Sequence, residues 1–472
     1  MSPSLQKKLH LFSLVTGTVL IAILSARPYA GAWNDGSRLA AVESLVDFHT
    51  WSIDESVFAR TPDIITKNWA AAYPPDDPQL AKTGTLDKLY IRDHYYSDKS
   101  PLPSLVMAGV YKALQTATGL SAGGNPPLFC YLMALIFSGG AYVISVCCMD
   151  ATANLLGLAW KLRLLISWSF ALATIALPYT REVNNHILLL AVFSAIMFLS
   201  VNYAQPGEAK QWRLAVIGAL MGIGYPIDLG TGPILVLCVT GLVAAQTRSA
   251  KDVALLLLAS FPWFLLHHLL NYRIGGVFKP ANSVPDYFLW PGSPFNSSNL
   301  TGGWSHKGVW DFLVYTAALM FGKKGFISHD LPLYLSIPAI VFLVKNKTAH
   351  RPLVWYSLAL ILGTWLIYGV TSNNYSGACC SIRWFVPLLA PFYFLLALFL
   401  KERPEFTGDL LALTAWGAAM AIVMWFKGPW MQHMVPGFWV FQGGALLSWL
   451  AWRLKNRPDF AHRATVVEER KS

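Results

Sequence analysis

Charged residues are scarce in this chain, and that scarcity excludes a soluble globular protein. Only 13% of the 472 residues are Asp, Glu, Lys or Arg, whereas soluble domains carry about 25%. Hydrophobic residues account for 55%, and they fall in blocks of about 17–22 residues, long enough to cross a bilayer core as helices. The composition therefore predicts an all-α polytopic membrane protein.

Acidic residues are the scarcer charge, with 25 Asp and Glu against 36 Lys and Arg and a net charge of +11. A basic chain can indicate a nucleic-acid partner, but here the basic residues lie in short links between apolar blocks. They are Lys161 and Arg163, Lys210 and Arg213, Arg248 and Lys251, Lys345, Lys347 and Arg351, Lys401 and Arg403, and Arg453, Lys455 and Arg457. This positive-inside distribution fixes membrane topology, and we expect no nucleic-acid partner.

Metal-site spacing and internal repeats are also lacking. The six cysteines show no zinc-binding pattern, and no repeat is strong enough to indicate a transporter built from two halves. Asp93 and His94 could bind a metal with one further carboxylate, but no spacing supports that site. No cofactor is firmly predicted, and a divalent metal stays an open alternative.

Twelve apolar segments are predicted to span the membrane, with both termini on the cytoplasmic side. They are residues 9–26, 127–149, 163–180, 185–203, 213–229, 231–247, 252–271, 331–345, 353–370, 383–400, 408–425 and 436–453. The first could instead be a cleaved signal peptide, but residues 25–28 make a poor cleavage site.

The chain is then one integral membrane domain, residues 1–472, with two long outer loops. The first loop covers about 27–126, the second about 272–330, and a cytoplasmic tail covers about 454–472. Because the inner loops are short, only the outer loops have room for a functional site.

Two segments of the first outer loop are predicted to be amphipathic helices lying in the membrane interface. If residues 102–120 crossed the membrane, every later basic link would move to the outer side, so we expect this segment to lie flat. Residues 37–47 are similar, with Leu39, Val42 and Val46 on one face and the charged residues elsewhere.

Charged residues gather at both ends of this loop. Asp35 lies shortly after the first apolar segment, where a partly desolvated carboxylate could act as a general base toward a hydroxyl or amine. It could equally cap the following helix, although Ser37 could supply that cap and leave Asp35 free. Asp98 and Lys99 precede the second amphipathic segment, where a lysine could bind a lipid phosphate or simply snorkel to the interface.

Three further residues are candidates by position. Arg181 lies on the outer side against the positive-inside trend, which favours a functional role. His329 follows two lysines at the outer start of a span, where the group could add to a phosphate site or anchor the boundary. Asp228 lies near the membrane edge, and a carboxylate there is either functional or paired with a basic group for structure.

Two motifs carry a resemblance. The first is Asn34-Asp35-Gly36-Ser37-Arg38-Leu39-Ala40, and the second is Tyr96-Ser97-Asp98-Lys99-Ser100-Pro101-Leu102. In order and spacing they resemble the GT-C membrane glycosyltransferases, nearest to the protein mannosyltransferase and aminoarabinose transferase branch. That branch has an acidic residue followed by Arg in its first outer loop, then a Lys-Pro-Pro-Leu-like motif. Here a serine replaces one proline, and the first motif lacks the usual Asp-Glu pair. The resemblance continues through residues 178–185 and recurs weakly at 377–387, where Arg383 begins a span.

The resemblance implies a function and roles for these residues. Asp35 would be the catalytic base, Lys99 would lie near the lipid phosphate, and Arg383 would be a second phosphate contact. Arg38 and Asp98 belong to the same two motifs and, with Arg181 and His329, complete the expected substrate-binding set. The reaction implied is the inverting transfer of a sugar from a polyprenyl-phosphate donor to a glycan, lipid or protein acceptor.

The expected location is a bacterial inner membrane, with the active site facing the periplasm or exterior and a role in the cell envelope. Two other classes stay open. A transporter or flippase for a lipid-linked sugar would use the same cations without needing Asp35, and a non-catalytic scaffold would need neither Asp35 nor Lys99.

Overall fold

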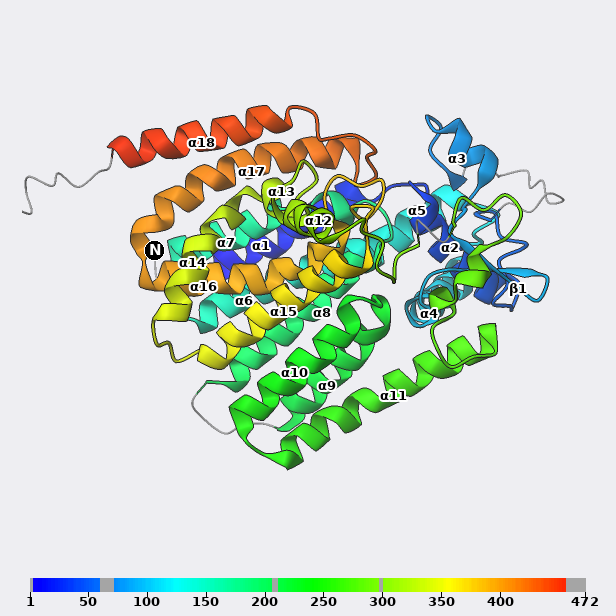
Figure 1. The fold of residues 1–472 in the computed structure, drawn as a ribbon, viewed down its shortest axis with the longest axis horizontal. Helices are drawn as coiled ribbons and strands as arrows, with labels where there is room; N and C mark the ends of the chain where they lie inside the picture. Colours follow the sequence, from blue (N-terminus) through cyan, green and yellow to red (C-terminus); the bar gives the residue numbers. More distant parts are fainter. Residues whose placement is uncertain (1–2, 60–71, 206–210, 297–299, 456–472) are drawn as a thin grey trace, which may run out of the picture.

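The computed structural model describes residues 3–59, 72–205, 211–296 and 300–455, and they form a helical bundle with one small hairpin (Figure 1). The predicted tail at 454–472 lies almost wholly outside the described residues. The amino-terminal part contains α1 (Pro3–Ser25), α2 (Trp33–Asp47), α3 (Pro78–Thr83), β1 (Lys88–Ile91), β2 (His94–Ser97), α4 (Pro101–Thr118), α5 (Pro126–Met133), η2 (Ala134–Gly139), α6 (Gly140–Leu155), α7 (Trp160–Leu172) and η3 (Pro178–Thr180).

The remaining elements complete the bundle. They are α8 (Asn185–Tyr203), α9 (Gln211–Gly224), η4 (Tyr225–Ile227), α10 (Thr231–Thr247), α11 (Ala250–Gly275), η5 (Ala281–Ser283), η6 (Pro285–Phe288), α12 (Val309–Phe321), α13 (Phe326–His329), η7 (Leu331–Leu335), α14 (Ser336–Lys345), α15 (Arg351–Thr371), η8 (Arg383–Leu388), α16 (Leu389–Glu402), η9 (Pro404–Phe406), α17 (Thr407–Lys427) and α18 (Phe438–Lys455). Figure 1 shows α2, α3, α4 and β1 together at one end of the bundle, which we call the loop end.

Seven helical segments of the described chain are long and apolar enough to cross a membrane. They are Lys8–Ser25, Pro126–Leu155, Asn185–Tyr203, Ala250–Gly275, Arg351–Thr371, Arg383–Glu402 and Pro404–Lys427. An eighth is possible if Val309–His329 and Leu331–Lys345, which meet at 115°, count as one span. The chain is therefore a multi-pass membrane protein built from helices.

The predicted count of twelve spans is wrong by this criterion of length and apolarity. The apolar blocks do form helices, but α7, α9, α10 and α14 have only 13, 14, 17 and 10 residues. α18, with 18 residues, is long enough but is not among the candidate spans of the described chain. Proline shortens α9 and α14. Pro226 lies in η4 directly after α9, and Pro332 lies in η7 directly before α14; a proline ring cannot continue the helical hydrogen bonding.

The prediction that residues 37–47 expose a charged face is wrong, because α2 lies inside the loop end; its position relative to the membrane interface stays a prediction. Every residue from 34 to 44 is buried. Its apolar side chains pack in a separate core with Phe58, Tyr111 and Phe129. On another side, Glu43 accepts hydrogen bonds from Ser56 Oγ at 2.6 Å and from the Val57 backbone at 3.0 Å. Neighbouring segments of the first outer loop therefore enclose α2. A helix lying on the membrane surface would instead expose its polar side chains to solvent along one face.

The segment 102–120 behaves as predicted in one respect, since α4 is not among the candidate spans of the described chain. Met107, Ala108 and Tyr111 are buried in the core that α4 shares with α2, whereas Val106 is exposed. This one-sided burial fits a helix packed at the edge of the bundle, and its position in a membrane interface stays a prediction.

The hairpin β1–β2 was not predicted. It positions Asp98 and Lys99, which directly follow β2. Lys88 pairs with Ser97 and Ile91 with His94 in antiparallel register, and Arg92 and Asp93 make the turn with positive φ angles of 52° and 66°. Leu89 and Ile91 pack against Ile274 and Phe288, so the hairpin joins the first outer loop to the second.

Candidate active site

Asp35 lies in the first turn of α2 and is completely buried. Its Oδ2 accepts the Gly31 backbone N–H at 2.5 Å, and its Oδ1 accepts the Ala32 backbone N–H at 2.8 Å. Asp35 therefore closes the amino terminus of α2, and the expectation that Ser37 would take over this role is wrong. Burial raises the pKa of Asp35 well above its usual range, and the nearby Glu182 carboxyl raises it further.

Arg38 lies one turn later on the same helix and is 2% exposed. Its Nη2 lies 3.5 Å from Asn34 Oδ1, while Nε has no hydrogen-bond partner. Burial lowers the pKa of Arg38 to about 10, an effect that Asp98 opposes and Arg383 reinforces. Its charge therefore interacts with Asp98 and Arg383, two groups far away in the sequence.

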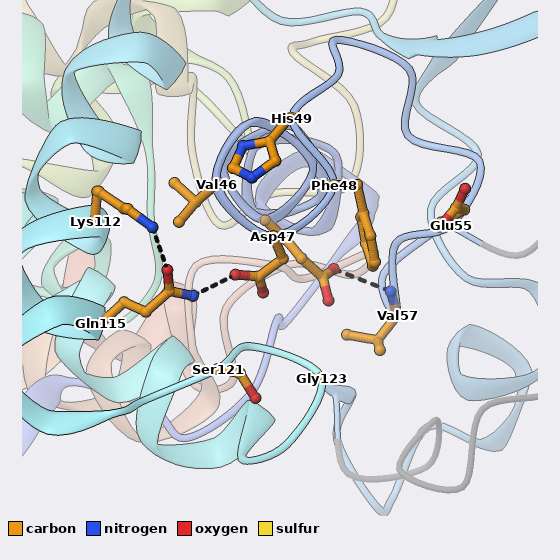
Figure 2. A pocket seen from close by; sticks show the side chains of 11 residues that line it. Val46, Asp47, Phe48, His49, Glu55, Val57, Lys112, Gln115, Ser121 and Gly123 are labelled. Carbon is orange, nitrogen blue, oxygen red and sulfur yellow. Dashed lines mark hydrogen bonds between the residues drawn. The ribbon is translucent and has the colours of Figure 1, made fainter.

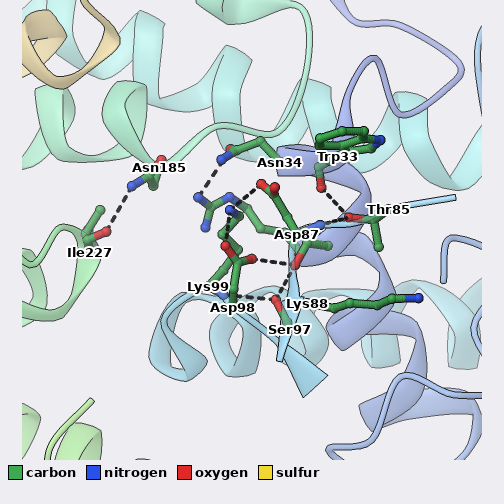
Figure 3. Close-up of polar contacts among 12 residues, drawn as sticks. Trp33, Asn34, Thr85, Asp87, Lys88, Ser97, Asp98, Lys99, Asn185 and Ile227 are labelled. Carbon is green, nitrogen blue, oxygen red and sulfur yellow. Dashed lines mark hydrogen bonds and ion pairs between the residues drawn. The ribbon is translucent and has the colours of Figure 1, made fainter. Parts of the chain in front are cut away.

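Lys99 is held by two carboxylates next to α2. Its Nζ donates to Asp87 Oδ2 at 2.6 Å and to Asp98 Oδ2 at 2.7 Å (Figure 3). Ser37 of α2 donates to Asp98 Oδ1 at 3.0 Å and shares a 2.7 Å hydrogen bond with Ser97. These bonds tie the end of β2 to the first turns of α2, so the two sequence motifs meet in space. Asp87, which the sequence reasoning missed, takes part of the charge of Lys99.

Arg383 reaches the same region from the start of η8. Its guanidinium lies 5.7 Å from the centre of the Trp430 ring, and its Nε has no hydrogen-bond partner. The backbone N–H of Arg383 donates to Ser376 Oγ at 3.1 Å, and the backbone N–H of Cys380 donates to Pro429 O at 2.8 Å. These hydrogen bonds connect the segment before η8 to Arg383 and to the residues that follow α17.

The link between α7 and α8 supplies the next group of polar residues. Arg181 donates to the carbonyl oxygens of Trp425 and, at 2.9 Å, Phe426, so it satisfies the carboxy-terminal end of α17. Its predicted part in substrate binding therefore competes with a structural one. Glu182 is 4% exposed, and burial raises its pKa to about 7 against the opposing charges of Arg181 and Arg27. A Cβ placed on Gly31 would lie 3.1 Å from Glu182 Oε1, which puts this carboxyl against the loop that caps Asp35.

Comparison with known proteins addresses the fold. No protein-family model matches the chain, and no curated protein matches it. Among solved structures, apo ArnT from Cupriavidus metallidurans is similar with a TM-score of 0.51 and 14% identity, over 93% of this chain and 75% of that one. The chain has a GT-C-like fold.

Two further structures are similar to the chain. ArnT from the same organism, bound to undecaprenyl phosphate, gives a TM-score of 0.48 and 13% identity over 93% of this chain and 75% of that one. The Archaeoglobus fulgidus oligosaccharyltransferase in its apo form gives a TM-score of 0.45 and 12% identity over 97% of this chain and 59% of that one. The match to apo ArnT confirms the resemblance read from the two loop motifs at the level of the GT-C-like fold.

Within this GT-C-like fold, the described residues contain 26 buried side-chain polar atoms without a hydrogen-bond partner, and nine of them belong to the segments that form the site. These nine are Nε of Arg27, Arg38, Arg181 and Arg383, Oε2 of Glu182, Nδ2 of Asn184, Oδ1 of Asn185, Nδ1 of His186 and Nε1 of Trp430. Each buried unpaired group costs about 1–3 kcal/mol, and native proteins seldom keep many. Such a set fits a cluster that receives a polar ligand.

His329 lies elsewhere in the GT-C-like fold. It is completely buried in α13, its ring packs against Phe438 with 5.1 Å between centroids, and its Nδ1 lies 2.8 Å from Gly325 O. The structure therefore does not bring His329 to the charged cluster. Asp93 and His94 occupy the hairpin turn, where His94 pairs with Asp54 at 2.7 Å. Among the described residues, no group of three or more metal-ligating side chains is placed to hold an ion.

A surface pocket of about 510 Å³ lies at the other end of α2, away from Asp35. It is lined by Glu43, Asp47, Lys112 and Gln115 among others, and Figure 2 shows the hydrogen bonds from Lys112 to Gln115 and from Gln115 to Asp47. None of the seven predicted site residues lines this pocket.

Proposed function

We propose that the protein is a glycosyltransferase that moves a sugar from a polyprenyl-phosphate donor to an acceptor, in a single membrane domain with its site at the loop end. The observation that carries the proposal is the meeting of Asp35 and Arg38 of α2, Lys99 and Arg383 from three separate segments in one largely buried polar cluster. A carboxylate beside several cations suits acid–base chemistry next to a phosphate leaving group.

Asp35 is the proposed base. It accepts the proton of an acceptor hydroxyl or amine while the acceptor atom attacks the anomeric carbon from the face opposite the phosphate. The bond from that carbon to the phosphate oxygen breaks, and the lipid phosphate leaves with the electron pair, so the product is inverted. A carboxylate has about four lone-pair sites, and the two backbone hydrogen bonds of Asp35 leave room for this proton.

Arg383 and Arg38 are the proposed main contacts of the donor phosphate. Both keep an Nε without a hydrogen-bond partner, and an arginine fork matches the geometry of phosphate oxygens. Lys99 already neutralises Asp87 and Asp98, so it contributes as one part of a charged network rather than as a free cation. Positive charge fixed in a buried site stabilises the negative charge that develops on the departing phosphate.

The loop end is proposed to face the periplasm or exterior of a bacterial inner membrane, because the basic links of the sequence then lie on the cytoplasmic side. The acceptor is a glycan, lipid or protein of the cell envelope.

The test is sugar transfer by the purified protein in nanodiscs, given a panel of polyprenyl-phosphate sugars and candidate acceptors. We expect transfer from at least one donor. Asp76→Asn, which alters an exposed carboxylate of the same outer loop, should behave as wild type. A protein that binds the lipid donors and moves them between leaflets without transferring sugar would instead support a flippase.

A further inference from the structure

A histidine and a buried carboxylate face each other beside the proposed phosphate site. His186 lies in the first turn of α8 and is 3% exposed, and its Nδ1 has no hydrogen-bond partner. Asp228 Oδ2 lies 3.6 Å from this Nδ1. The other oxygen of Asp228 is occupied, because it accepts the backbone N–H groups of Gly230 and Thr231 and the hydroxyl of Tyr368.

This arrangement fixes the position of Asp228 and leaves one of its oxygens for His186. Oδ1 closes the amino terminus of α10, and Tyr368 is itself stacked on Trp384 with 4.2 Å between ring centroids and 5° between planes. The Asn184 side chain accepts the backbone N–H of His186 at 2.8 Å, which fixes the start of α8. The backbone of His186 is therefore fixed, and its Nδ1 faces Asp228 without a full hydrogen bond.

The remaining charged groups around the ring are the cations of the proposed phosphate site. Arg383 begins η8, which packs against α8, and Arg383, Arg38 of α2 and Lys99 before α4 all act on His186 electrostatically. Asp228 lies 3.6 Å from Nδ1 and accepts a hydrogen bond from the Tyr368 hydroxyl. In an unliganded site, burial of the imidazole opposes its protonation most, and the charges of Arg383, Arg38 and Lys99 oppose it further, although Lys99 is itself paired with Asp87 and Asp98. The Asp228 carboxylate favours protonation. A bound phosphate adds negative charge among the same cations and therefore favours the imidazolium.

We infer that His186, oriented by Asp228, takes up a proton when the lipid phosphate binds and then contacts that phosphate as an imidazolium. The inference rests on the proposed function and extends its phosphate-binding set. The donor is a phosphodiester with one negative charge, and the departing lipid phosphate is a monoester that can carry two. A positive imidazole beside it gains interaction energy as the bond to the sugar breaks, so it favours the transition state over the bound donor. The proton comes from solvent and returns to it when the lipid phosphate leaves.

The test measures protons rather than turnover. Binding of a short-chain polyprenyl phosphate is followed by calorimetry at pH 7 in buffers of different ionisation enthalpy, which gives the number of protons taken up per phosphate bound. We expect wild type to take up more protons than His186→Gln. His267→Gln, which alters another buried histidine outside the cluster, should match wild type. The affinity ratio of wild type to His186→Gln should be larger at pH 6 than at pH 8, since the ionisation of the phosphate cancels in the ratio.

Equal proton uptake by wild type and His186→Gln would overturn the inference, even if sugar transfer is intact. If wild type binds no lipid phosphate and transfers no sugar, the proposed function itself fails, which is a separate outcome. If His186→Gln does not fold, Asp228→Asn gives the same comparison. It keeps the oxygen that caps α10, removes the charge opposite Nδ1 and should also lower the proton uptake; unchanged uptake would contradict the pairing.

Discussion

At the scale of single residues, Asp35 combines a structural and a proposed chemical role. Its two backbone hydrogen bonds hold it at the start of α2, and those bonds favour the ionised carboxylate. Burial and Glu182 act in the opposite direction and raise its pKa. The two backbone hydrogen bonds that fix the position of Asp35 thus also limit the increase in its pKa. A general base needs both a fixed position and a raised pKa.

The first prediction concerns the pH dependence of transfer. A base works only when ionised, and the pKa of Asp35 is raised, so kcat/KM should fall as pH drops through a value well above the usual pKa of an aspartate, about 3.9. Glu182→Gln removes the neighbouring carboxyl and should move this fall to lower pH. Glu405→Gln, at an exposed site, is the matched control. An unchanged or oppositely shifted profile in Glu182→Gln would contradict the assigned coupling.

The second prediction concerns the phosphate contact of Arg383. Arg383→Gln should raise KM for the lipid donor by about 10- to 100-fold, corresponding to the roughly 1.5–3 kcal/mol of a hydrogen bond to a charged group. Arg403→Gln changes an arginine paired with Glu405 on the surface and should leave KM as in wild type. Steady-state kinetics with varied donor gives both values, and equal KM values in the two variants would remove Arg383 from the phosphate site.

Local motifs were enough to select Asp35, Arg38, Lys99 and Arg383, because charge is rare in this chain and stands out beside apolar segments; the structure brings them together, and their roles stay predictions. Glu182 was missed as a site residue although it follows Arg181 on the same outer link. Asp87 had no local signal, since only the hairpin brings it to Lys99. His329 was selected for its neighbouring lysines, but the turn at α13 directs it into the apolar packing around Phe438.

At the scale of elements, sequence periodicity predicted where helices form, but it did not predict which helices are buried by neighbouring segments. The apolar blocks became helices, and α4 was recognised as a helix that does not span. The burial of α2 could not be read from its sequence, because Arg38 and Glu43 look like surface charges until tertiary neighbours enclose them. The β1–β2 turn uses Arg92 and Asp93 with positive φ rather than glycine or Asn-Gly, so it lacked the usual hairpin signal.

The third prediction tests how the hairpin holds Lys99 in place. Trp290 donates its Nε1 to Lys88 O at 3.1 Å, and its ring packs against Tyr95 with 5.5 Å between centroids. Trp290→Ala should destabilise the protein by about 3–5 kcal/mol, as buried large-to-small aromatic changes do. It should also increase hydrogen exchange in residues 88–97. Trp310→Ala, at a residue that is 77% exposed, is the control. Normal protection of the hairpin in Trp290→Ala would contradict the docking role.

The fourth prediction concerns the buried Glu43 in α2. Burial raises its pKa to about 8, opposed by hydrogen bonds from Ser56 and Val57. Because the folded state binds this proton more tightly than the unfolded state, the contribution of Glu43 to stability falls as pH rises from about 4.3, the usual glutamate value, to about 8. Glu43→Gln should lose this dependence, so its Tm relative to wild type should rise between pH 5 and pH 8. A constant difference in Tm across this range would show that Glu43 is already ionised in the folded protein.

At the scale of the whole molecule, the fold is shared with ArnT at 14% identity. Helices in a bilayer must satisfy their backbone internally, so many apolar sequences can build the same bundle, and sequence similarity fades sooner than the fold. That the chain is a multi-pass bundle of helices was predictable from hydropathy. The number of full spans was not, because prolines and breaks divide apolar blocks that look continuous in the sequence.

The fold by itself does not assign chemistry, so the central claim rests on the site where the loop motifs meet. The most direct measurement is single-turnover sugar transfer at saturating lipid donor, comparing wild type, Asp35→Asn and Asp76→Asn. Loss of a general base costs about 10²- to 10⁴-fold, so Asp35→Asn should transfer sugar slower by that factor while still binding the donor, and Asp76→Asn should match wild type. Equal single-turnover rates for Asp35→Asn and wild type would contradict the account.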